Sequence, residues 1–74
     1  MNNIQAVLNM GCKFLKKNSI NSYQIDAELL LSKVLNKKRE YLVLNNTQIL
    51  SSDLIFQFEV LLNLGAKAKV DDKV

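Results

Sequence analysis

The chain is marked by what it lacks: its 74 residues include no proline, no histidine and no tryptophan, and only two glycines and one cysteine. The absence of proline and the scarcity of glycine favour long, uninterrupted helices over a turn-rich β fold. A single cysteine without any histidine excludes an internal disulfide, a multi-cysteine metal site and a serine–histidine–aspartate triad. The sequence therefore predicts an all-α protein without a metal site.

The lone cysteine and the apolar segments also bear on location. Cys12 lies within a helical pattern, so we expect a packed or half-exposed small side chain rather than a reactive thiol. A chain without a disulfide framework fits a reducing, cytoplasmic setting. No apolar run approaches the ~18 residues that a membrane span needs, and the amino terminus lacks the features of a signal peptide. We therefore expect a cytoplasmic protein without a membrane partner.

Several kinds of functional site are also missing. The net charge of +3 comes from basic residues in three separate groups, whereas nucleic-acid binding needs a concentrated basic face. Gly11 and Gly65 are isolated, so neither belongs to a glycine-rich turn that cradles a nucleotide. Asp26 and Glu28, two residues apart on a helix, point about 200° away from each other and cannot form a catalytic pair. We expect no catalytic or cofactor-binding residue in this chain.

Apolar residues make up 49% of the chain. They recur at three- and four-residue intervals, the spacing of one face of a helix. The spacing predicts a small bundle of four helices, one of them short, in an up-down-like arrangement. We expect helices at about 3–17, 22–35, 39–44 and 52–64. For the third segment a strand is the rival interpretation, because Tyr and Val favour pleated surfaces, but its helical neighbours favour a helix.

Polar residues mark the expected helix starts. Asn2 or Asn3 can cap the first helix. Asn21 opens a capping box for the second helix, and Ile20 and Ile25 can form the accompanying hydrophobic staple.

The fourth helix has both a start and a stop signal. Ser51 is a suitable cap, and Gly65 is a plausible end. The residues from 66 to 74 have little to bury and are expected to be frayed. The chain thus divides into a helical domain, 1–64, and a disordered tail or linker remnant, 65–74.

Two helices carry apolar residues outside their main stripes. Phe56, Val60 and Leu64 form a ridge at four-residue spacing on the fourth helix, and Ile25 with Leu29 forms a smaller ridge on the second. Either both ridges pack inside the bundle, or they are surfaces that bind a partner.

The turn between the second and third helices is basic. Lys37, Lys38 and Arg39 are either a solvated turn or a contact for an acidic partner. Arg39 could also pair with Asp26, because a short turn can fold the third helix back toward the second. An exposed pair of this kind contributes about 0–1 kcal/mol.

The order of motifs resembles one known family. Asp26-Ala27-Glu28 with Leu30 and Leu31 is followed by Leu35-Asn36 and Arg39, and then by Leu50-Ser51 before the last helix. This ordered set, over about residues 4 to 64, resembles the amino-terminal domain of the HemK/PrmC family, the release factor glutamine methyltransferases. The chain departs from the family in having no counterpart of the catalytic Asn-Pro-Pro-Tyr signature, because it contains no proline.

The resemblance implies a function that residue patterns alone do not. In that family a helical domain precedes a catalytic domain that uses S-adenosylmethionine to methylate the glutamine in the Gly-Gly-Gln loop of peptide chain release factors. The helical domain is expected to help dock the release factor. The expected partners are therefore a release factor and the catalytic domain, and the candidate contact residues are Phe56, Val60, Leu64, Lys37, Lys38 and Arg39. A free-standing helical interaction module is the alternative function.

Overall fold

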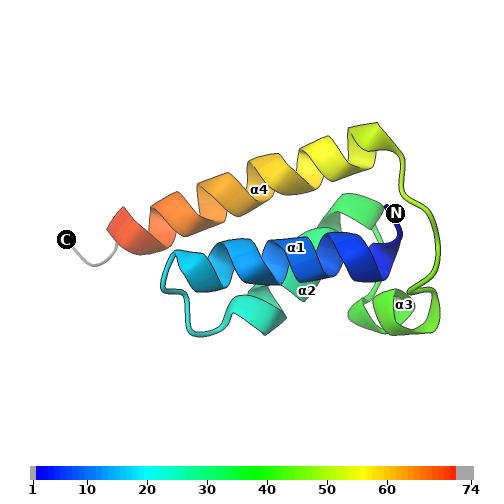
Figure 1. Ribbon diagram of the computed structural model, residues 1–74, viewed down its shortest axis with the longest axis horizontal. Helices are drawn as coiled ribbons and strands as arrows, with labels where there is room; N and C mark the ends of the chain where they lie inside the picture. Colours follow the sequence, from blue (N-terminus) through cyan, green and yellow to red (C-terminus); the bar gives the residue numbers. More distant parts are fainter. Residues whose placement is uncertain (1, 72–74) are drawn as a thin grey trace.

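The computed structural model describes residues 2–71, with side chains as far as Gly65. It contains α1 (Ile4–Lys17), α2 (Tyr23–Leu35), the short α3 (Arg39–Leu44) and α4 (Ser52–Asp71). The chain reverses direction between α1 and α2 and again before α4, and α3 lies at the end of the bundle where the amino terminus is found (Figure 1). The prediction of a small all-α bundle is confirmed, and the third segment is a helix with the expected bounds.

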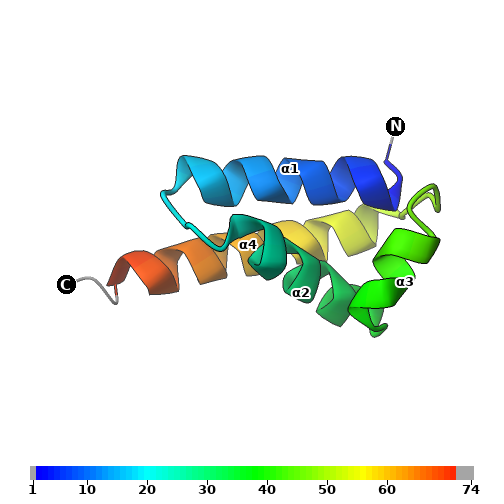
Figure 2. The same ribbon diagram turned by 90° about the horizontal axis from the view of Figure 1, so that it is seen from below.

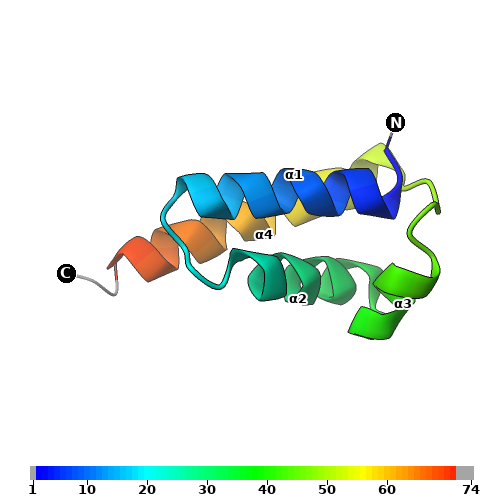
Figure 3. The same ribbon diagram turned by 60° about the horizontal axis from the view of Figure 1, so that its bottom comes forward.

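The three long helices pack against one another around one core. Figures 2 and 3 show α4 lying against the α1–α2 pair and continuing beyond its end. Phe58 on α4 is fully buried, at 0% exposure, and its ring lies close to Gly11 on α1. All four helices and two connecting segments contribute buried apolar side chains, which are Ile4, Val7, Leu15, Ile20, Ala27, Leu31, Leu42, Leu50, Phe58 and Leu62.

The amino terminus is tied to the loop before α4. Asn3 and Ile49 form an antiparallel bridge, and the N–H of Leu50 donates to the carbonyl of Asn2 at 2.8 Å. Tyr41 on α3 donates a hydrogen bond from its hydroxyl to the side-chain oxygen of Gln48 in the same loop. These bonds hold α3 and the loop in place, which a helix of six residues cannot do by itself.

Of the two candidate caps of α1, the structure selects Asn3. Its side-chain oxygen accepts a hydrogen bond from the N–H of Ala6 at 2.8 Å, and its backbone is extended, as capping requires. Lys16 and Lys17 lie in the last turn, where cations interact favourably with the helix dipole.

Replacing Asn3 by alanine should lower the free energy of unfolding by about 1 kcal/mol, because the cap loses its acceptor for an otherwise unpaired N–H. Urea denaturation followed by circular dichroism would measure the loss. Asn9→Ala is the matched control, since Asn9 is exposed within the same helix. Equal losses in the two variants would contradict the capping role.

The expected start of α2 is wrong in its detail. The cap residue is Ser22 rather than Asn21, and its hydroxyl donates to a carboxylate oxygen of Asp26 at 2.9 Å. Ile20 takes part in closing α1, and its staple with Ile25 stays a prediction. The N–H of Ile20 reaches back to the carbonyl of Leu15, Ser19 adopts a φ of 63°, and Ile20 becomes buried, as in a Schellman motif.

The expected end of α4 is also wrong. The helix continues through Gly65 to Asp71, because one glycine costs a helix about 1 kcal/mol and does not by itself terminate it. Of the tail expected to be frayed, residues 66–71 continue the helix, and residues 72–74 lie outside the described residues. The predicted cap at the amino-terminal end of α4 is confirmed, since Ser51 Oγ accepts a hydrogen bond from the N–H of Leu54 at 3.4 Å.

Candidate docking groove between α2 and α4

The described part of the chain offers little for catalysis. Between residues 2 and 71 no three Cys, Asp or Glu side chains gather where they could hold a metal ion. Burial raises the pKa of the Cys12 thiol, and the negative charge of Glu28 raises it further. The thiol is therefore protonated at neutral pH and a weak nucleophile. Over the same residues, no helix combines the length and apolar character required to cross a lipid bilayer.

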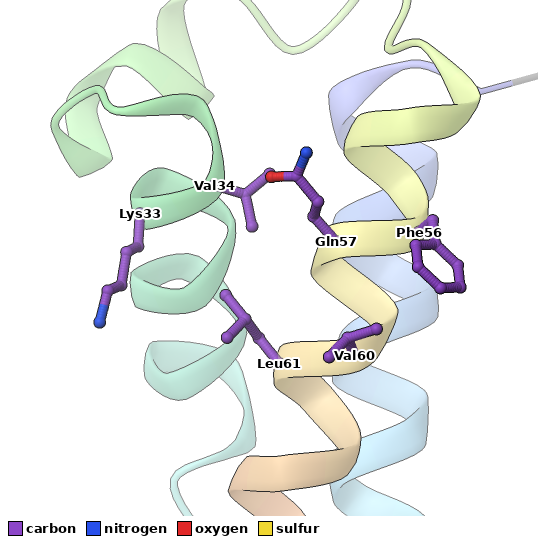
Figure 4. A pocket seen from close by; sticks show the side chains of 6 residues that line it. All are labelled: Lys33, Val34, Phe56, Gln57, Val60 and Leu61. Carbon is purple, nitrogen blue, oxygen red and sulfur yellow. The ribbon is translucent and has the colours of Figure 1, made fainter.

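An apolar groove lies between α2 and α4. Its volume is about 400 Å³, and its lining residues are Lys33, Val34, Phe56, Gln57, Val60 and Leu61. Figure 4 shows the side chains of Val34, Gln57 and Leu61 directed into the space between the helices. Val60 lies on α4 at the edge of the groove, and Phe56 projects from α4 on the side away from α2 (Figure 4). These two residues form the outer lip of the groove. The groove exists because α4 directs Phe58 and Leu62 into the core and leaves its neighbouring face uncovered.

The predicted α4 ridge is at the surface. Phe56 is 67% exposed, Val60 41% and Leu64 59%. Phe56 and Val60 line the groove, whereas Leu64 lies one turn further along α4 and does not line it. The interpretation that this ridge packs inside the bundle is therefore wrong.

The second predicted ridge is exposed as well, but it lies elsewhere. Ile25 and Leu29 are about half exposed, at 50% and 48%. Leu29 lines a separate, smaller cavity of about 200 Å³, next to Leu30 and Gly65. The two ridges therefore belong to different surfaces, and only the one on α4 lines the larger groove.

The basic residues of the α2–α3 turn divide into two groups. Lys37 and Lys38 line a shallow cavity of about 470 Å³ that also includes Lys33. Because Lys33 lines the apolar groove too, the two cavities adjoin. The ammonium of Lys37 lies 5.3 Å from the centre of the Tyr41 ring, which helps to hold it over α3.

Arg39 is engaged within the bundle. Its guanidinium donates to a carboxylate oxygen of Glu28 at 2.8 Å, so the expected pairing with Asp26 is wrong. The short turn does fold α3 back onto α2, as expected, but the geometry of α2 brings Glu28 to Arg39. Both side chains are partly exposed, and such a pair contributes about 0–1 kcal/mol. Arg39 therefore contributes less free charge to this surface than its lysine neighbours do.

Of the six residues that line the groove, the sequence predicted Phe56 and Val60 and missed the other four, Lys33, Val34, Gln57 and Leu61. The spacing of the apolar residues favours a core position for Leu61 and the solvent side of α2 for Lys33. Lys33 lies in the last turn of α2, directly before the basic turn, and this closeness in sequence was an available signal. No comparable signal identifies Gln57.

Comparisons with known proteins agree with this architecture. The family model described as the PrmC N-terminal domain matches residues 6–66. A protein of Clostridium botulinum, named release factor glutamine methyltransferase, is 52% identical to the chain over 42 residues, which is 57% of this chain and 15% of the relative. The matched segment thus spans a small part of that relative's length. No solved structure matches the chain significantly.

Proposed function

Because the chain belongs to the PrmC N-terminal domain family, we propose that it is the substrate-recognition domain of a protein methyltransferase acting on peptide chain release factors. The reaction would use S-adenosylmethionine to modify the glutamine of the Gly-Gly-Gln loop. Because release factors act in translation termination, the proposed function would be carried out in the cytoplasm. The observation that carries the proposal is the exposed apolar groove between α2 and α4, in a chain of this family.

This chain would bind the substrate, and another domain would catalyse the transfer. Among the described residues that line the groove, Lys33 alone is charged, and its ammonium would repel the positive sulfonium of S-adenosylmethionine. We assign recognition to residues 1–64 and a connecting role to residues 65–74. The name of the Clostridium botulinum relative supports the release factor as substrate and a methyltransferase domain as the catalytic partner.

A docking domain would raise the local concentration of the release factor near the catalytic domain and would orient it there. A release factor held on the groove meets the catalytic domain as a tethered partner, so the second contact forms at a high effective concentration. The apolar lip supplies affinity when a partner covers it, because large exposed apolar side chains gain most from being removed from water.

Phe56→Asp should weaken binding of the chain to a bacterial release factor about tenfold, because it places a charge on the lip of the groove. Titration calorimetry with the wild type and the variant would measure the change. The variant should remain folded, since Phe56 is 67% exposed. Circular dichroism of both proteins checks this.

Val43→Asp is the matched control for this experiment. Val43 is 70% exposed on α3 and does not line the groove, so the same change there should leave affinity within about twofold. Failure of the folded wild-type chain to bind any bacterial release factor would contradict the proposal and favour a free-standing module for another partner. Equal losses in the two variants would contradict the placement of the surface.

A further inference from the structure

The groove and the lysine surface beside it are continuous. Lys33 lines both, and Lys37 and Lys38 extend the basic surface toward α3. We propose that the segment received here is an amphipathic helix whose apolar face is flanked by Asp and Glu. The inference rests on the proposed function in that the release factor supplies this helix.

The positive charge of this surface favours a partner segment that carries acidic residues. The two adjoining cavities are lined by three lysines and, among the described residues, by no carboxylate. All three lysines are exposed. Glu28 on α2 is paired with Arg39 at 2.8 Å. A partner with carboxylates at the edge of its apolar face would therefore gain attraction both on approach and in the complex.

The two helices that form the walls of the groove favour a helical partner segment over an extended one. Both walls are α-helices, whose backbone N–H and C=O groups are already paired within the helix. An extended segment lying between them would find no backbone partners, whereas a helix satisfies its own. Phe56 and Val60 are one turn apart, about 6 Å, which matches the i, i+4 spacing of side chains on a helix packed alongside.

The size of the groove fits side chains from one element. A volume of about 400 Å³ lies near the lower end of the range for ligand pockets, roughly 300–1,000 Å³. It holds a few apolar side chains, as in other helix-in-groove complexes. The carboxylates would lie outside the cavity, over Lys33, Lys37 and Lys38.

Charge removal on the chain tests the inference with the release factor itself. The triple variant Lys33→Gln, Lys37→Gln and Lys38→Gln should bind about tenfold more weakly at ~50 mM salt and lose most of the salt dependence of binding. The matched control is Lys13→Gln, Lys16→Gln and Lys17→Gln, which removes three lysines from α1, outside the groove. The control should change affinity by less than about twofold.

These outcomes separate the inference from the proposed function. Release-factor binding that is lost in Phe56→Asp but unchanged in the groove lysine variant would overturn the acidic helix and leave the recognition role intact. Equal losses in the two lysine variants would also overturn it, because only overall charge would then matter.

A peptide probe decides the inference even if no release factor binds. Two synthetic helical peptides of about 18 residues would carry the same apolar face, flanked by Glu in one and by Lys in the other. The Glu peptide should shift the amide NMR signals of Lys33, Val34, Gln57 and Val60, and the Lys peptide should not. Equal binding of both peptides, binding of neither, or shifts confined to other surfaces would overturn the proposal.

Discussion

Phe58→Ala is expected to lower the free energy of unfolding by about 3–5 kcal/mol, the range for removing a fully buried aromatic side chain. Phe58 has 0% exposure and is among the largest fully buried side chains of the core. A domain of this size is stable by only a few kcal/mol, so the variant should be largely unfolded at 25 °C. Circular dichroism at 222 nm with a urea titration would show the loss of the cooperative transition.

Phe56→Ala is a closely matched control, because it removes the same side chain from the same helix two residues away. Phe56 is 67% exposed, so this variant should change stability by less than about 0.5 kcal/mol. Comparable destabilisation by the two variants would mean that α4 does not direct Phe58 into the core and Phe56 to the surface. A large difference would establish separately that Phe58 holds the core and that Phe56 is free for binding.

The helices could be predicted because their signals are local. The apolar spacing of α1 and the capping side chain of Asn3 both lie within a few residues of the feature they determine. The short α3 was also placed correctly, as Arg39–Leu44, because the polar turns on either side leave room for only one element. The spacing of apolar residues and the capping side chains thus suffice to predict the number and order of the helices in the described part of the chain.

Features that depend on tertiary packing could not be predicted in the same way. Arg39 pairs with Glu28 rather than Asp26, a choice that depends on how α3 crosses α2. Ser32 on α2 is buried although serine is usually exposed, and its hydroxyl donates to the carbonyl of Leu29 at 2.8 Å. That local hydrogen bond satisfies the hydroxyl and so allows its burial.

The site was predicted in part for the same reason. Helical spacing located the Phe56, Val60 and Leu64 ridge but could not show whether a neighbouring helix covers it. The structure leaves the ridge exposed, and of its three residues only Phe56 and Val60 line the groove. Exposure depends on how far apart α2 and α4 lie, which no pattern in a single sequence records.

Gly11→Ala is expected to destabilise the bundle by about 1–3 kcal/mol, the usual range for overpacking. Helix propensity alone would predict the opposite, a gain of about 1 kcal/mol. A Cβ at this position would lie 2.5 Å from one ring carbon of Phe58 and 2.8 Å from another, closer than real Cβ contacts. The ring is fully buried and cannot move aside without disturbing the core, so packing outweighs propensity.

Gly65→Ala isolates the packing effect, because it is the same substitution within another helix of the same protein. There the added Cβ would lie 3.8 Å from a methyl carbon of Leu30, an ordinary contact. We therefore expect a gain of about 0.5–1 kcal/mol at Gly65 and a loss at Gly11, measured by urea denaturation. Stabilisation by both substitutions would mean that α1 and α4 do not approach each other closely at Gly11. Opposite signs would show that Gly11 is required for the close contact that buries Phe58 and thereby directs Phe56 to the surface.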